Sequence, residues 1–371
     1  MNRAIITMTE QRIKDLQERI KNNPADDEAI EEYAIVLSDI GENEEALKNF
    51  IFLKNKYPDN AQHYYNIGII LEKLKKFDDA VVAYEKALSL ENEDTDIMFN
   101  LALAYIKTEE YDEAEKLFLN VIEKDKDDEN SYFHLGEIYT RKKEFEKSVE
   151  YLTKALELDE KDTIAKFYLA YSKTQLNQIE EAIKLYNEVI ETSPDYSWAY
   201  YNLASIYIDK NDDETAVKYL EKTIETNPND IKAIKMLVKI HSKHKKYMLA
   251  EKILRQAMSN MPDEADIYYL LSRIYKELKN RINYSKYLKL AISKKITFTG
   301  DVEELEAELK LLEQQNQQVQ EDKKEQQTPA QKPVANKQVA KPTARPTARP
   351  TTARPAPRPA TKPSSTQQTK K

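Results

Sequence analysis

Apolar side chains recur along most of the chain with the spacing of amphipathic helices. In residues 108–127 they follow the i, i+3, i+4, i+7, i+8 pattern, which places them on one face of a helix. The apolar positions of this segment are Ala114, Leu117, Phe118, Val121 and Ile122. Asp112 precedes them and is predicted to be the N-cap of the helix. The pattern therefore predicts short helices, each with one buried face.

The same arrangement returns every 34 residues without an insertion or deletion. Prolines on this lattice are Pro24, Pro58, Pro194, Pro228 and Pro262. One series of small residues is Ala46, Ala80, Ala114, Ser148, Ala182, Ala216 and Ala250. A second, small at nearly every step, is Ala34, Gly68, Ala102, Gly136, Ala170, Ala204, Val238 and Ser272. Because small side chains let helices approach closely, each unit is expected to hold two helices that touch at these positions.

The lattice divides the chain into a stack of units with a cap at each end. Residues 1–26 are predicted to form an N-terminal half-unit or cap helix. Eight complete units are predicted at 27–60, 61–94, 95–128, 129–162, 163–196, 197–230, 231–264 and 265–298. Residues 299–321 are expected to form a capping helix, begun by a capping box of Asp301 and Glu304. Its apolar stripe permits a short coiled coil, but fewer than three heptads are present, so a monomer is favoured.

Residues 61–94 carry the pattern most completely. The matching positions are Tyr64, Ile67, Gly68, Leu71, Ala80, Tyr84 and Ala87, with Asn92 in place of the terminal proline. In these positions the chain resembles the tetratricopeptide repeat family, over roughly four fifths of its length. The resemblance implies an all-α fold, a right-handed superhelical α-solenoid of helix-turn-helix units. It also implies a concave groove, lined by the first helix of each unit, that holds peptides or helices of partner proteins.

The geometry of the family places two consecutive residues of each first helix toward this groove. The residues expected to form a peptide groove are Tyr65, Asn66, Phe99, Asn100, Phe133, His134, Phe167, Trp198, Tyr201 and Asn202. Aromatic rings give contact area at low entropic cost, and amides can bond to a peptide backbone. The asparagines resemble the ladder of repeat domains that deliver protein substrates to a glycosyltransferase. Aromatic residues and Asn are also common at these positions of the family, so a packing role stays open.

Composition narrows the possible functions. The chain has only 4 Gly and no Cys, which favours helices joined by corners without glycine and excludes disulfides and thiolate metal sites. No Gly-rich phosphate loop or nucleophile motif occurs, so no catalytic, cofactor-binding or metal-binding residues are predicted and the protein is not expected to be an enzyme. His241 takes the place of a core tyrosine, which favours burial over metal binding with His244. Without a long apolar segment, the protein is expected to be soluble and cytoplasmic.

Charge separates the C-terminus from the repeats. Residues 323–371 hold 12 Lys or Arg and one acidic residue, Glu325, so this segment carries +11 and the rest of the chain −19 of the net −8. Residues 322–371, rich in Pro, Thr, Ala and Arg, are expected to be a disordered basic tail. The tail could contact nucleic acid or an anionic surface, fold back on the acidic repeats, or act as a spacer.

These patterns favour a non-catalytic scaffold or adaptor that binds a peptide or helix of a partner protein in the groove. One alternative is a tether that contacts nucleic acid or an anionic surface through the tail while the repeats recruit cargo. Another is a regulatory or substrate-recruiting subunit of an enzyme complex.

Overall fold

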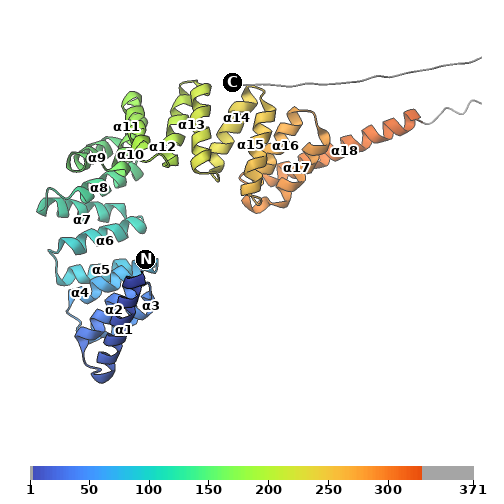
Figure 1. Ribbon diagram of the computed structural model, residues 1–371. Coiled ribbons are helices and arrows are strands. Elements are labelled where there is room, and N and C mark those ends of the chain that lie inside the picture. Colours follow the sequence, from blue (N-terminus) through green and yellow to red (C-terminus); the bar gives the residue numbers. More distant parts are fainter. Residues whose placement is uncertain (1–2, 328–371) are drawn as a thin grey trace, which may run out of the picture. The chain divides into compact units, whose positions relative to one another are not determined.

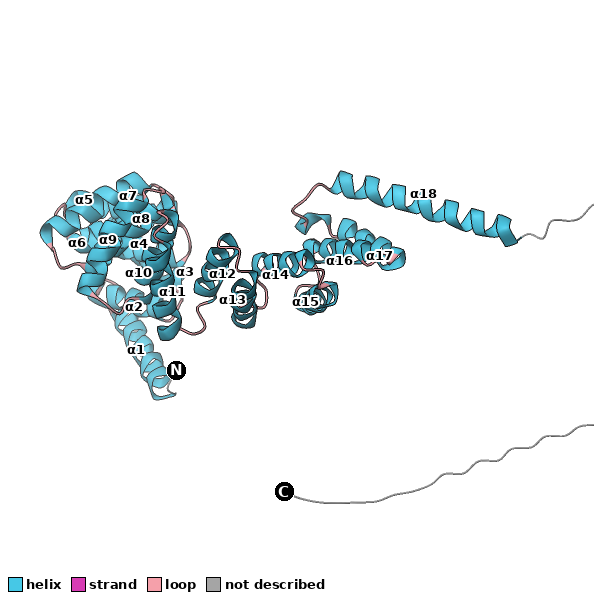
Figure 2. Ribbon diagram, turned by 90° about the horizontal axis from the view of Figure 1, so that it is seen from above, coloured by secondary structure: helices cyan, strands magenta, loops and turns pink. Residues whose placement is uncertain are grey.

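The computed structural model describes residues 3–327, which form helices joined by short loops (Figures 1 and 2). The helices are α1 (Arg3–Asn22), α2 (Asp27–Asp39), α3 (Asn43–Lys56), α4 (Ala61–Lys73), α5 (Phe77–Leu90), α6 (Thr95–Lys107), α7 (Tyr111–Lys124), α8 (Glu129–Arg141), α9 (Phe145–Leu158), α10 (Thr163–Gln175), α11 (Ile179–Thr192), α12 (Ser197–Asp209), α13 (Asp213–Thr226), α14 (Ile231–Lys243), α15 (Tyr247–Asn260), α16 (Ala265–Glu277), α17 (Arg281–Ser293), the 3₁₀-helix η1 (Lys295–Thr297) and α18 (Val302–Gln327). The described residues contain no strand, and the predicted all-α solenoid is confirmed.

Each pair of helices is joined by a corner of one repeated design. A residue with positive φ stands at every corner, and seven of these eight residues are not glycine; they are Gly41, Lys75, Glu109, Lys143, Asn177, Asn211, Lys245 and Lys279. The next amide donates a hydrogen bond to the carbonyl five residues back, as from Lys76 to Leu71 at 2.8 Å. This bond satisfies a carbonyl at the end of the first helix and fixes the start of the second. Corners without glycine, expected from the low glycine count, are therefore found in all pairs except the first, where Gly41 takes this position.

This corner also explains why one predicted cap is wrong. α7 begins at Tyr111, its N-cap residue is Glu110, and no side chain caps it. Asp112 lies within the first turn instead, where it accepts a hydrogen bond of 2.7 Å from Nζ of Lys142 in the following unit. The left-handed residue Glu109 sets the start of α7, so a capping side chain is not required.

The small residues of the lattice lie where the two helices of a unit cross. Ala46, Ala80 and Ala114 are completely buried. A Cβ atom added to Gly68 would lie 2.4 Å from the ring of Tyr84, which is itself completely buried. The hydroxyl of Ser148 donates to the carbonyl of Gly136 at 3.0 Å, so this polar substitute is satisfied. A larger side chain at such a position would separate the helices.

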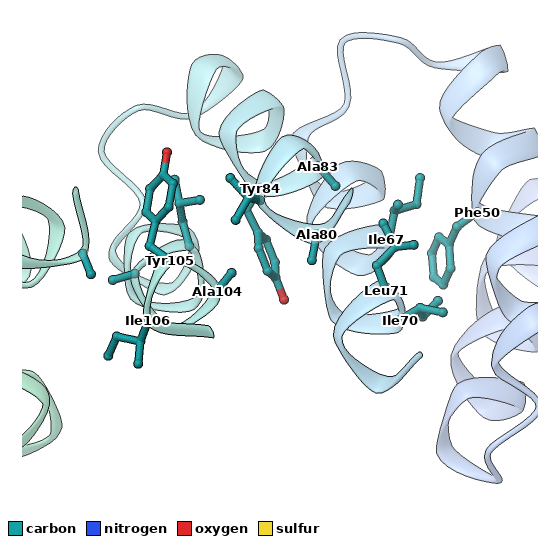
Figure 3. Close-up of a cluster of buried hydrophobic side chains, with 14 of the residues drawn as sticks. Phe50, Ile67, Ile70, Leu71, Ala80, Ala83, Tyr84, Ala104, Tyr105 and Ile106 are labelled. Atoms are coloured by element: carbon teal, nitrogen blue, oxygen red, sulfur yellow. The ribbon is translucent and has the colours of Figure 1, made fainter. Parts of the chain in front are cut away.

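The apolar core continues from one unit to the next. A single cluster of buried side chains extends from Ile30 to Tyr139, across four successive helix pairs. Figure 3 shows part of it, with Phe50 of α3 facing Ile67 and Ile70 of α4. Because each helix pair buries its apolar face against its neighbours, stability depends on the interfaces between units.

Both ends of the stack are covered by an extra helix. Leu16 of α1 packs with Ala29 and Val36 of α2. At the other end, Oδ1 of Asp301 accepts hydrogen bonds from the amides of Glu303 and Glu304 at the start of α18. α18 reaches Gln327, beyond residue 321, where the cap helix was expected to end. Residues 323–327 are good helix formers, and the first proline follows only at Pro329.

The tail from residue 328 onward lies outside the described residues, so its predicted disorder stays a prediction. Among the helices within residues 3–327, none is long and apolar enough to cross a membrane.

Glu308 joins α18 to the last helix pair. Its carboxylate accepts hydrogen bonds from Arg273 at 2.6 and 2.7 Å, from Lys276 at 2.6 Å and from the hydroxyl of Tyr284. Tyr284 occupies a lattice position that is small in the other units, and its ring reaches toward α18. The hydrogen bond from Arg273, aided by those from Lys276 and Tyr284, outweighs burial and lowers the pKa of Glu308 to about 2.

We expect Glu308→Gln to loosen α18 from the stack, because the substitution removes the charge that Arg273 and Lys276 share. The free energy of opening of residues 302–313 should fall by roughly 1–3 kcal/mol, measured by hydrogen exchange. Since the pKa is lowered from 4.5 to about 2, the stabilisation by Glu308 is present above pH 4.5 and is lost as the pH falls toward 2. Glu306→Gln, at an exposed position of the same helix, is the control. Equal exchange in the two variants would contradict this role.

Candidate functional site

The ten residues predicted to form a groove lie on the first helices of five successive units. Tyr65 and Asn66 are on α4, Phe99 and Asn100 on α6, Phe133 and His134 on α8, Phe167 on α10, and Trp198, Tyr201 and Asn202 on α12. We call this surface the first-helix face. Nine of its side chains are half-buried and Trp198 is exposed. The same helices carry buried residues such as Leu101 and Leu135, and five of the ten residues pack against the core while staying partly exposed; they are Tyr65, Phe99, Phe133, Phe167 and Tyr201.

Ring contacts connect the first-helix face across unit boundaries. The ring centroids of Phe99 and His134 are 5.8 Å apart, which joins α6 to α8. Phe133 lies 5.9 Å from Tyr168, which joins α8 to α10. Within the fifth unit, Phe167 lies 5.1 Å from Tyr196, the residue directly before α12. These half-exposed rings therefore form a continuous band along the middle units.

The same rings also pack against the second helices. Phe99 contacts Phe118 of α7 with centroids 5.4 Å apart, and Phe167 contacts Tyr186 of α11 at 5.8 Å. Tyr65 lies 5.8 Å from Tyr84 of α5. Packing and exposure thus coexist in one side chain, because one edge of each ring is covered and the other faces outward.

The asparagine amides are held in fixed orientations. Nδ2 of Asn100 donates to the hydroxyl of Tyr65 and to the carbonyl of Asp96, both at 2.9 Å. Nδ2 of Asn202 donates to the carbonyl of Trp198 at 2.8 Å. Within the described residues, Oδ1 of both side chains accepts no hydrogen bond and can accept one from a ligand. Asn66 is oriented differently, since its Oδ1 accepts from Gln62 at 3.3 Å.

An ion pair that the sequence analysis missed lies among the rings. Glu137 of α8 is paired with Arg141 at 2.7 Å and with Nδ1 of His134 at 3.2 Å. Burial alone would raise the pKa of Glu137, but the hydrogen bonds from His134 and Arg141 lower the pKa to about 2. The sequence does hold a signal for this site, because Glu137 is a charged residue at a position where the neighbouring units have Leu103 and Tyr171.

The first-helix face also has an exposed apolar pair, of which the sequence analysis identified only one member. Trp198 is 50% exposed and Ile164, at the equivalent position of the preceding unit, is 49% exposed. Trp198 contacts Tyr201, with centroids 6.2 Å apart. In three of the preceding units, the position equivalent to Ile164 holds a polar residue: Gln62, Asp96 or Asn130. The change to an apolar residue at Ile164 was the sequence signal that could have identified this exposed site.

Farther along, the first helices border a cavity of about 520 Å³. Its lining includes Lys235 and Lys239 of α14, Tyr269 and Arg273 of α16, and Phe298 before α18. Lys235 is bound to the buried Asp266, whereas Lys239 forms no salt bridge within the described residues. The basic side of α14 is thus partly neutralised.

The two histidines near the seventh corner have different surroundings. His241 is buried in the core, whereas Nε2 of His244 lies 2.7 Å from a carboxylate oxygen of Asp213. Residues 3–327 contain no cluster of three or more His, Cys, Asp or Glu side chains that could hold a metal ion.

Comparison with protein families gives matches over several units. Models described as tetratricopeptide repeat match residues 27–94, 71–138 and 174–239. A model described as anaphase-promoting complex, cyclosome, subunit 3 matches residues 109–189. No curated protein matches the chain in sequence.

Solved structures resemble the chain in fold. A tetratricopeptide repeat protein from Parabacteroides merdae is 19% identical, with a TM-score of 0.50 over 77% of this chain and 98% of that one. Cut9–Hcn1 of the APC/C is 16% identical, with a TM-score of 0.50 over 71% of this chain and 52% of that one. YrrB, described as a TPR protein with an unusual peptide-binding site, is 24% identical, with a TM-score of 0.43 over 50% of this chain and 96% of that one.

We predict that Glu137 and Arg141 stabilise the first-helix face as a pair. A double-mutant cycle of Glu137→Gln and Arg141→Gln should give a coupling free energy of about 1–2 kcal/mol, because the carboxylate is mostly buried. Glu150 and Lys154 of α9, also four residues apart but exposed, are the control and should give about 0.3–0.5 kcal/mol. Equal coupling in the two cycles, measured by chemical denaturation, would contradict the prediction.

Proposed function

Because this chain belongs to the tetratricopeptide repeat family, we propose that it is a non-catalytic scaffold that holds an extended segment of a partner protein on the first-helix face. The observation that carries the proposal is the band of half-exposed rings that crosses unit boundaries from α6 to α10 and continues to Tyr196, directly before α12. A ligand that follows this band would cover several units at once. An extended segment suits such a band because its length matches a row of sites with a fixed repeat.

The exposed pair of Trp198 and Ile164 supplies the apolar anchor of this interaction. Large aromatic side chains commonly carry most of the binding free energy of an interface. Trp198 is restrained by its contact with Tyr201, so little side-chain entropy is lost when a ligand covers it. We therefore propose that the ligand places an apolar side chain against these two residues.

The fixed amides supply the polar part of the interaction. Oδ1 of Asn100 and Oδ1 of Asn202 are free within the described residues to accept hydrogen bonds from backbone amides of the ligand. Nδ2 of each side chain already donates within the repeats, to two acceptors in Asn100 and to one in Asn202, which restrains the orientation of both amides. Because these contacts involve only the backbone of the ligand, they would hold extended segments of many different sequences. Trp198 and Ile164 would then favour the segments that place an apolar side chain against them.

Two alternatives have a specific observation behind them. The match of residues 109–189 to a model named for a subunit of the anaphase-promoting complex favours a role as a recruiting subunit of an enzyme complex. The 12 Lys or Arg of residues 323–371 favour a tether to nucleic acid or an anionic surface. Both alternatives are compatible with a partner on the first-helix face. In each case we propose that the interaction takes place in the cytoplasm.

The test is selection of peptides from a displayed library on the immobilised full chain, followed by titration of the selected peptides. We expect Trp198→Ala to weaken their binding by roughly tenfold or more, and Asn202→Ala by a smaller factor. Val82→Ala is the matched control, because Val82 is an exposed apolar residue of the second helix α5. Failure to select any peptide, or equal affinity for the Trp198→Ala variant and the wild type, would overturn the proposal.

A further inference from the structure

The first turns of the second helices change character at the end of the stack. Acidic residues occupy this turn in α3, α5, α7, α9, α11 and α13, where they interact favourably with the helix dipole. α15 and α17 have none. Met248 and Ile282 stand where the sixth unit has Glu214, at spacings of 34 and 68 residues. The last two complete units therefore replace a stabilising charge with an apolar side chain.

These apolar side chains are among the most exposed in the described part of the chain. Met248 is 70% and Ile282 is 83% exposed, and Leu249 and Leu278 beside them are also exposed. None of the four lines the cavities of about 410–520 Å³ found nearby on α13–α18. We call Met248, Leu249, Leu278 and Ile282 the corner patch. Its side chains protrude from helix starts and a corner.

The corner patch is bordered by cations without partners. Lys245 and Lys246 form the corner before α15, and Lys279 and Arg281 lie at the corner before α17. All four are exposed and form no salt bridge within the described residues. The corner of the preceding unit has the opposite charge, with Asp212, Asp213 and Glu214 at its end. Lys75 and Lys76 occupy the same places in the second unit, but acidic residues follow them in the first turn of α5, whereas the first turns of α15 and α17 have none.

One hydrogen bond connects the helix ends at these two corners. The hydroxyl of Tyr247, the first residue of α15, donates to Glu277 at the end of α16 at 3.4 Å. The corner from Leu278 to Arg281 follows Glu277 directly and leads to Ile282. The two apolar positions and the four cations therefore belong to one edge of the stack.

We propose that the corner patch docks on the surface of an anionic lipid bilayer. Met248, Leu249 and Ile282 would enter the headgroup region, while Lys245, Lys246, Lys279 and Arg281 contact lipid phosphates. Protruding apolar side chains suit a soft, flat surface, whereas a partner helix requires a hollow to lie in. The patch is separate from the first-helix face, so a docked protein could still hold a peptide.

The test is co-sedimentation of the full chain with vesicles of phosphatidylcholine alone and of phosphatidylcholine mixed with phosphatidylserine. We expect binding to the anionic vesicles only. The double variant Met248→Glu/Ile282→Glu should bind about tenfold more weakly, because both apolar contacts are lost and the added charges are repelled. Glutamate is the native residue at the equivalent position of α13, so the variant should fold, as checked by circular dichroism.

Val82→Glu is the control, because it places the same charge on an exposed apolar position of α5. The tail is present in every variant, so a difference between them reports on the corner patch and not on the tail. A direct measurement uses Ile282→Trp in a Trp198→Phe background, whose emission should shift to the blue with anionic vesicles. Absence of wild-type binding, equal binding by the double variant, or no spectral shift would overturn the proposal. The first of these results would point to an acidic protein as the occupant.

Discussion

The close approach of two helices at a small side chain is the contact on which the rest of this structure depends. On the second helix, alanine or serine stands at the crossing of each pair except the last, and on the first helix of the second unit not even a Cβ atom fits between Gly68 and the ring of Tyr84. Because the crossing is tight, each pair presents its apolar side to the next in a fixed register, and one core runs through several units. Where the small residue is absent, at Tyr284, the larger ring contacts the cap helix and its carboxylate Glu308.

The fixed register of the stacked helices also brings equivalent residues of successive units together into one surface. Phe99, Phe133 and Phe167 lie at equivalent positions, and their ring contacts connect neighbouring units because the helices stack without a shift. Each ring is covered on one side by a second helix and open on the other, so packing and binding are not competing explanations for the same residue. The ion pair of Glu137 with Arg141 adds a charged site to this band, and the lowered pKa of Glu137 keeps its carboxylate ionised over most of the pH range.

Features that repeat could be predicted from the sequence, whereas departures from the repeat mostly could not. The helical pattern, the small residues and the low glycine count led to an all-α solenoid with corners that lack glycine, and the structure is such a solenoid, with glycine at only one of the eight corners. Asp112 was expected to be a cap, but the left-handed residue Glu109 fixes the start of α7 through the backbone. Glu137, Ile164, Met248 and Ile282 were missed, because their surroundings depend on which neighbours the stack brings beside them. The role of the ten groove residues stays a prediction, although their common surface is now described.

Hydrogen exchange of an Ala182→Leu variant tests most directly whether tight crossings maintain the register. Ala182 is completely buried, in a core cluster with Ala170 of α10. We expect exchange to accelerate by roughly tenfold or more in α10 and α11, with a smaller change in α9 and α12 and none in α2–α5, because overpacking acts through neighbouring interfaces. Unchanged exchange in α10 and α11, or a uniform increase along residues 3–327, would contradict the account.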